Sequence, residues 1–150
     1  MADPRQRVKY RHIGVIRVTF KYDASIVYDN TKKGGSVSTG LAVTLTANDV
    51  VGLVADGQLV VGRLDMVRAD GICEVQVGGA TIFLPGTAAS VSVGSRIVGA
   101  LLVAAKGYVR QQAVAVLAEV AVGRGWILTN ADIDNIQGVQ VTNGVAVYLT

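Results

Sequence analysis

Short runs of β-branched and aliphatic residues that repeat with a period of two constrain the fold of this chain more than any other feature. Glycine, asparagine or aspartate borders each run, as expected for strands that end in turns. Three dipeptides that readily adopt a positive φ lie between such runs: Asp56-Gly57, Asp70-Gly71 and Asn143-Gly144. The runs are residues 13–20, 42–46, 58–62, 72–77 and 80–84. The pattern predicts an all-β fold, either a compact sandwich or a barrel-like domain.

The length and the composition predict the size of the domain and the kind of side chain that fills its core. A chain of 150 residues suits a single domain that buries roughly two-thirds of the surface of its unfolded chain. Hydrophobic residues make up 51% but aromatic residues only 5%, so aliphatic side chains are expected to fill the interior. The aliphatic share exceeds what a small domain readily hides, which indicates contacts between subunits.

Two later segments allow more than one interpretation. Residues 112–122 are rich in alanine, which suits a helix, but Val114, Val116, Val120 and Val122 occupy alternate positions. We therefore expect a strand there. Thr129-Asn130-Ala131-Asp132 has the composition of a helix N-cap, which predicts a short helical turn.

The Asn143-Gly144 pair predicts the closing hairpin. A two-residue turn there would place polar and apolar residues on one face of the sheet. A three-residue loop, residues 142–144, instead sets Val141 opposite Val145 and Val139 opposite Val147. The longer loop, with valines on one buried face, is the expected arrangement.

Charge divides the chain into a basic head, residues 1–33, and a long remainder, residues 34–150. The head holds eight basic and three acidic residues, a net charge of +5, so the remainder carries −2 of the total of +3. We interpret the head as an extended arm or as the first strands. It is expected to meet an acidic surface of nucleic acid, anionic lipid or protein, although an ordinary solvated strand followed by a turn has the same charge pattern.

The residues that usually carry catalysis are few. His12 is the single histidine and has no carboxylate or cysteine neighbour in the sequence, so a surface or packing role is favoured. Cys73 alternates with polar Glu74 and Gln76, which predicts a buried thiol, and a reduced intracellular setting is favoured. Asp132 and Asp134 are assigned to caps and turns. We expect no enzyme, no metal and no cofactor.

Glycines and serines show no catalytic spacing either. Gly34-Gly35, Gly78-Gly79 and Gly123-Arg124-Gly125 lack the spacing of phosphate-binding loops and are interpreted as turns. The serines lie outside any G-x-S-x-G context. The longest apolar runs, residues 97–105 and 113–122, are about half the roughly 20 residues that cross a bilayer, so no membrane association and no signal peptide are expected.

Nucleic-acid binding is a competing hypothesis. Lys9-Tyr10-Arg11-His12 and Lys21-Tyr22 place cations beside aromatic rings, a combination that can neutralise phosphates and stack bases. The sequence has no ribonucleoprotein-type aromatic motif, and the charge outside the head is negative. Nucleic acid is therefore disfavoured as a partner.

From residue 40 onward the chain resembles a family of small, β-rich phage capsid cement proteins, also called head-decoration proteins. An ordered series of phrases carries the resemblance across two-thirds of the chain: residues 57–62, the phrase Ala80-Thr81-Ile82-Phe83-Leu84-Pro85-Gly86, residues 93–98, residues 106–109 and the valine-rich residues 139–149.

The resemblance implies a non-enzymatic virion protein, made in the host cytoplasm, that binds the outer surface of an icosahedral phage capsid. Such a protein stabilises contacts between major capsid protein subunits, commonly as a homo-oligomer that is a trimer or a dimer. The basic head and the long alanine-valine stretch depart from the family pattern. We hypothesise that an arm docks on acidic coat surfaces through Arg5, Arg7, Lys9, Tyr10 and Arg11. Another virion part, a tail tube or a head-completion protein, is the alternative, together with a single-stranded nucleic-acid-binding module.

Overall fold

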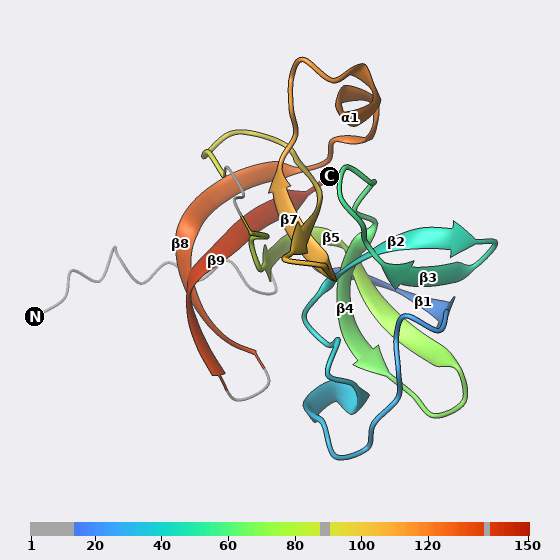
Figure 1. Cartoon of the computed structure of the whole chain (residues 1–150). Helices are drawn as coiled ribbons and strands as arrows, with labels where there is room; N and C mark the ends of the chain where they lie inside the picture. Colours follow the sequence, from blue (N-terminus) through green and yellow to red (C-terminus); the bar gives the residue numbers. More distant parts are fainter. Residues whose placement is uncertain (1–13, 88–90, 137–138) are drawn as a thin grey trace, which may run out of the picture.

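The computed structural model describes residues 14–87, 91–136 and 139–150, and these residues confirm the predicted all-β, compact fold. Seven strands form one sheet in the order β1-β3-β2-β4-β5-β9-β8, and β6 and β7 form a separate hairpin (Figure 1). One short α-helix and one 3-10 helix complete the elements found among the described residues. In chain order they are β1 (Ile16–Tyr22), η2 (Lys33–Gly35), β2 (Ala42–Ala47), β3 (Val50–Leu53), β4 (Gly62–Val67), β5 (Ile72–Phe83), β6 (Ile97–Leu102), β7 (Ala105–Gln111), α1 (Leu117–Val122), β8 (Trp126–Ile136) and β9 (Val139–Leu149).

The first five strands close into a ring, which we call the barrel. β1 pairs antiparallel with β5 and also parallel with β3, where Lys21 and Tyr22 lie opposite Val50 and Val51. β2 pairs with both β3 and β4, and β4 pairs with β5. Part of the basic head, residues 16–22, therefore forms a strand of the barrel. The ring leaves few unpaired strand edges, which is how barrels avoid edge-to-edge association.

The remaining elements form a second lobe: the last part of β5, strands β9 and β8, the β6–β7 hairpin and α1. β5 passes through both regions, because its first residues pair with β1 and β4 and its last five pair with β9. The change of partner occurs at Gly78, opposite Ile16, and Gly79, opposite Leu149. The sequence predicted a turn between two strands at these glycines, and that prediction is wrong. Gly79 has a left-handed φ of +83° within one long strand, a conformation that glycine adopts without a steric penalty.

Two clusters of aliphatic side chains fill the interior, as the composition predicted. The barrel cluster is made of Ile26, Val43, Val51, Leu64, Val67, Cys73 and Val75. The second cluster gathers around Phe83 and includes Ile97, Val109, Ile127, Val145, Val147 and Leu149. Cys73 is fully buried, as predicted, and its burial raises the pKa of the thiol to about 11. A thiol with so high a pKa is almost wholly protonated at pH 7 and is a poor nucleophile.

The structure overturns both predictions made for the end of the chain. Asn143-Gly144 does not form a hairpin loop but lies inside β9, with Gly144 opposite Asp132 of β8. Gly144 is buried there, and a Cβ at this position would come within 2.9 Å of the Asp132 carbonyl oxygen and of Ile82. The glycine thus permits close packing of backbone rather than a turn. Residues 129–132 belong to β8 and not to a helical turn, because pairing with β9 outweighs the local capping preference.

Two boundaries along the barrel also differ from the predictions. Residues 58–61 precede the strand and β4 begins only at Gly62. The two runs predicted at residues 72–77 and 80–84 form one strand, β5, which ends at Phe83, one residue earlier than expected. The turns expected at Asp56-Gly57 and Asp70-Gly71 are present, and both glycines have a left-handed φ. Within the described ranges, no helix has the length and apolar character to cross a membrane.

Candidate interaction surface

A short apolar segment, residues 113–122, projects from the second lobe and contains α1 (Figure 1). The sequence predicted a strand here, and that prediction is wrong. The segment leaves β7, turns, and forms a six-residue helix that ends at Val122 and is capped by Gly123. Alanine favours the helix, and a side-chain contact to the body, described next, holds one residue of the segment inward.

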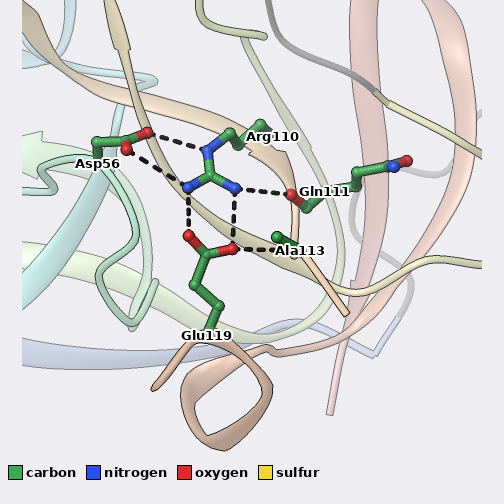
Figure 2. A network of polar contacts seen from close by, with 5 residues as sticks. All are labelled: Asp56, Arg110, Gln111, Ala113 and Glu119. Atoms are coloured by element: carbon green, nitrogen blue, oxygen red, sulfur yellow. Dashed lines mark hydrogen bonds and ion pairs between the residues drawn. The ribbon is translucent and has the colours of Figure 1, made fainter. Parts of the chain in front are cut away.

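The inward residue is Glu119, the single charged residue of the segment. It is 8% exposed and lies against Arg110 of β7 (Figure 2). Arg110 donates two hydrogen bonds to this carboxylate, from Nη1 to Oε2 at 3.0 Å and from Nη2 to Oε1 at 2.5 Å. The backbone N–H of Ala113 donates a third, to Oε2 at 2.7 Å. A paired guanidinium and carboxylate of this geometry form a strong, directional contact.

Asp56 extends the contact to the body of the protein. It lies in the turn before Gly57 and accepts a hydrogen bond from Arg110 Nε at 2.9 Å, with a second contact from Nη2 at 3.4 Å (Figure 2). Arg110 therefore joins the apolar segment to a loop more than fifty positions earlier in the sequence. We call Asp56, Arg110 and Glu119 the charged clasp.

The electrostatics of the clasp favour its ionised state. Hydrogen bonds from Arg110 and from the Ala113 backbone lower the pKa of Glu119 to about 2. The two carboxylates in turn raise the pKa of Arg110 above its usual value. Both groups are charged at neutral pH, and each offsets the cost of burying the other. The clasp therefore holds the segment 113–122 against the rest of the protein.

Arg124 fixes the other end of the segment. Its backbone pairs with Ile97 at the start of β6, and its half-buried side chain donates to the carbonyl oxygens of Val60 and Val61, just before β4. The same guanidinium donates to the carbonyl oxygens of Val77 in β5 and Thr150 at the chain end. Desolvation lowers the pKa of Arg124. One side chain thus links three stretches of backbone across the two lobes.

With its acid turned inward, the segment presents apolar side chains to solvent. Val114 is 86% exposed and Leu117 is 83% exposed, and Val116 and Val120 are more than two-fifths exposed. This is the reverse of an ordinary amphipathic helix, which buries its apolar face. A run of exposed apolar side chains of this kind is typical of a protein interaction site.

The residues that the sequence analysis proposed for partner binding, Arg5, Arg7, Lys9, Tyr10 and Arg11, lie outside the described residues, as does His12. The described chain starts at Gly14, where an added Cβ would lie 3.5 Å from Tyr148 Oη and 3.6 Å from the Cα of Gly79. Gly14, the first described residue of the head, therefore lies at the boundary between the two lobes.

Two aromatic residues that could stack on a ligand, Tyr22 and Trp126, contact other residues of the chain. Tyr22 donates from its hydroxyl to the Arg68 carbonyl oxygen at 2.6 Å and packs against the barrel cluster, so its ring is committed to the fold rather than to base stacking. Trp126 is about half exposed and stacks on Tyr148, with ring centroids 6.4 Å apart. In the part of the chain that the structure describes, no group of three or more His, Cys, Asp or Glu side chains could hold a metal ion.

Sequence reasoning missed the charged clasp and Arg124. A signal for Glu119 was present, because a lone acid in a ten-residue uncharged run has to find a buried partner or interrupt an apolar face. The identity of the partner was not readable, since Arg110, nine positions before Glu119, meets it only through the turn after β7, and Asp56 lies 54 positions before Arg110. Comparison of the chain with protein families, with curated proteins and with solved structures gave no match.

Proposed function

We propose that this protein is a non-enzymatic structural component of a virion that binds the outer surface of an icosahedral phage capsid. In this role it stabilises contacts between major coat subunits and acts as a homo-oligomer, a dimer or a trimer. It is made in the host cytoplasm and resides on the assembled shell. The family resemblance of residues 40–149 supplies the identity of the partner.

One structural observation supports a binding role above others: the apolar segment 113–122 faces solvent while its acid is fastened inward. Leaving Val114 and Leu117 in water forgoes about 1.5–3 kcal/mol per side chain relative to full burial. The clasp holds these side chains in a fixed place, so a partner surface can cover them with little loss of conformational entropy.

The basic head supplies a second contact in this proposal. Its residues Arg5, Arg7, Lys9, Tyr10 and Arg11 are suited to acidic coat surfaces. Such contacts are screened by salt, with a Debye length of about 8 Å at physiological ionic strength. Several heads in one oligomer would bind the shell with multivalent strength.

The test is a density-gradient separation of the lysate in which the protein is naturally produced, run with and without nuclease and probed for this chain. Migration with large particles that survives nuclease supports a capsid role. If the protein no longer migrates with large particles after nuclease treatment, it is a nucleic-acid-binding module. If it forms free rings instead of coating a shell, it is a tail-tube or head-completion protein. A small free species in both runs contradicts the proposal.

Matched variants then test the surface itself. Leu117→Asp places a charge on the apolar segment, and Val37→Asp does the same at an exposed valine that follows η2 in the connection between β1 and β2. We expect Leu117→Asp to lower the number of copies per particle by tenfold or more, with Val37→Asp close to the parent. Equal occupancy for both variants would remove the segment from the attachment site.

A further inference from the structure

Two aromatic rings stack on the outward face of the β8–β9 pair. Trp126 of β8 lies opposite Tyr148 of β9, with ring centroids 6.4 Å apart and 25° between the ring planes. Their chain neighbours Ile127 and Val147 belong to the buried cluster around Phe83, so the two rings point to the other face of the sheet. Trp126 is 52% exposed there. We call Trp126 and Tyr148 the aromatic platform.

The exposed face of the platform is suited to a cation. The π face of an indole is its electron-rich side, and it attracts guanidinium groups more often than ammonium groups. Residues 125–150 contain two aspartates and no lysine or arginine, so the side chains of this part of the chain carry a charge of −2. Arg124, immediately before it, is turned to the carbonyl oxygens of Val61 and Val77. The cation that complements the platform therefore comes from another part of the chain or from a partner.

The basic head joins the body beside this platform. A Cβ added to Gly14 would lie 3.5 Å from Tyr148 Oη and 3.9 Å from Tyr148 Cε2, so the Gly14 backbone lies next to the Tyr148 ring. Gly14 has a left-handed φ of +66°, which lets the chain bend there without a steric penalty. The head is therefore connected to the body on the face of the sheet that carries the platform.

Among the residues that precede Gly14, Arg11 is the closest cation in sequence. It stands three positions earlier, and three residues span at most about 11 Å. The platform lies within that reach, because Gly14 adjoins Tyr148 and the ring of Trp126 follows at 6.4 Å. A guanidinium is planar and stacks on an aromatic face, which the ammonium of Lys9 does not do. The opposite charges of the head, +5, and of the remainder, −2, favour the same contact.

We propose that the aromatic platform is the binding site of the basic head, with the Arg11 guanidinium stacked on the exposed indole face of Trp126 in the same chain. This contact fixes the root of the head, so that Arg5, Arg7 and Lys9 start from a defined place at the lobe boundary. The inference rests on the proposed function only for what those three residues bind, since the contact itself forms in the free protein.

Tryptophan fluorescence of the purified full chain tests the contact, because Trp126 is the single tryptophan of the protein. A stacked guanidinium shields the indole from acrylamide, so we expect Arg11→Ala to raise the quenching constant about 1.5-fold or more. Deletion of residues 1–12 should have the same effect. Arg11→Lys keeps the charge but loses the planar stack, and should restore only part of the shielding. Arg5→Ala removes the same charge further from the platform and should leave the quenching unchanged, as should Arg96→Ala at an exposed arginine of the body.

A second measurement locates the guanidinium. In NMR spectra the ring current of Trp126 should shift the Arg11 side-chain protons upfield, and Trp126→Leu should abolish that shift. Equal quenching in the parent and Arg11→Ala overturns the proposal, as does an equal increase in Arg5→Ala. Quenching that falls as the protein concentration rises also overturns it, because the platform would then be covered by a second copy. No particle takes part in these measurements, so the failure of this contact and the failure of shell binding are observed separately.

Discussion

The barrel and the second lobe are held together in different ways. In the barrel each strand finds a neighbour on both sides, and β1 closes the ring through β3 and β5. In the second lobe, backbone hydrogen bonds to the loops around Gly57 and Leu84 attach the β6–β7 hairpin. The segment 113–122 and the lobe boundary depend instead on guanidinium groups, Arg110 in the charged clasp and Arg124. Backbone pairing is shared by the whole ring, whereas a side-chain attachment depends on one residue.

The difference teaches where each region is vulnerable. A ring of strands is sensitive to anything that pushes backbones apart. A segment attached by side chains is sensitive to the loss of a single donor, because the buried acceptors that the donor leaves behind have no replacement. The predictions that follow probe the two regions with single substitutions.

The largest effect is expected at Arg124. Arg124→Ala removes donors from the carbonyl oxygens of Val60, Val61 and Val77, and should lower the free energy of unfolding by about 3–4 kcal/mol. Urea denaturation gives the magnitude, and hydrogen exchange gives the location. Amides of β8 and β9 should lose protection before those of β2 and β3. Arg96→Ala serves as the control, because this exposed arginine lies near Arg124 in space but makes only one long side-chain hydrogen bond, to the Gly123 carbonyl oxygen at 3.5 Å. Simultaneous loss of protection in both lobes would contradict the contrast between them.

The barrel should be destabilised by adding a side-chain atom where two strands lie close together. An ideal Cβ on Gly62 would lie 2.0 Å from the carbonyl oxygen of Gln76, so Gly62→Ala forces β4 away from β5. We expect a loss of about 2–3 kcal/mol. Gly71→Ala is the control, because an added Cβ there meets nothing within 4 Å and the cost is limited to its left-handed φ. Equal thermal shifts for the two variants would show that close packing at Gly62 does not matter.

The clasp should contribute about 2 kcal/mol at neutral pH. Glu119→Gln keeps the size of the side chain but loses its charge, so the segment 113–122 should exchange its amides faster while the barrel stays protected. Asp56→Asn, at the more exposed carboxylate, should have a smaller effect. An unchanged exchange pattern in Glu119→Gln would exclude the clasp as the attachment of the segment.

The contribution of Glu119 should depend on pH in a defined direction. Its pKa is about 2 in the folded protein and 4.5 is the ordinary value, so the stabilisation is present above about pH 4.5 and is lost as the pH falls toward 2. The difference in unfolding free energy between the parent and Glu119→Gln should therefore shrink across this window. A constant difference down to pH 2 would assign the effect of the substitution to packing.

The smallest effect on stability is expected at the exposed apolar surface. Leu117→Asp alters a side chain that is 83% exposed and should change the free energy of unfolding by about 0.5 kcal/mol or less. Val37→Asp should be similarly mild. A large loss of stability in purified Leu117→Asp would mean that the segment is packed in solution, and its role as a binding surface would then fail.

The sequence alone determined the fold class and much of the core. Alternation of β-branched residues is a local property, so it predicted an all-β domain, the strand residues 42–46, 72–77 and 80–83, and the buried thiol of Cys73. The aliphatic character of the interior also followed directly from composition. Charge along the chain marked the basic head as the most cationic region.

Tertiary structure decided what local pattern could not. Residues 112–122 carry both a strand pattern and helix-forming alanines, and the pairing of Glu119 with Arg110 holds the segment away from any sheet. Gly78-Gly79 and Asn143-Gly144 have the composition of turns, yet both lie within long strands because neighbouring backbones approach too closely there, or bend too sharply, for a larger residue. Contacts between residues far apart in the chain carry no local signature, which is why Arg124, Asp56 and the aromatic platform emerge only from the folded molecule.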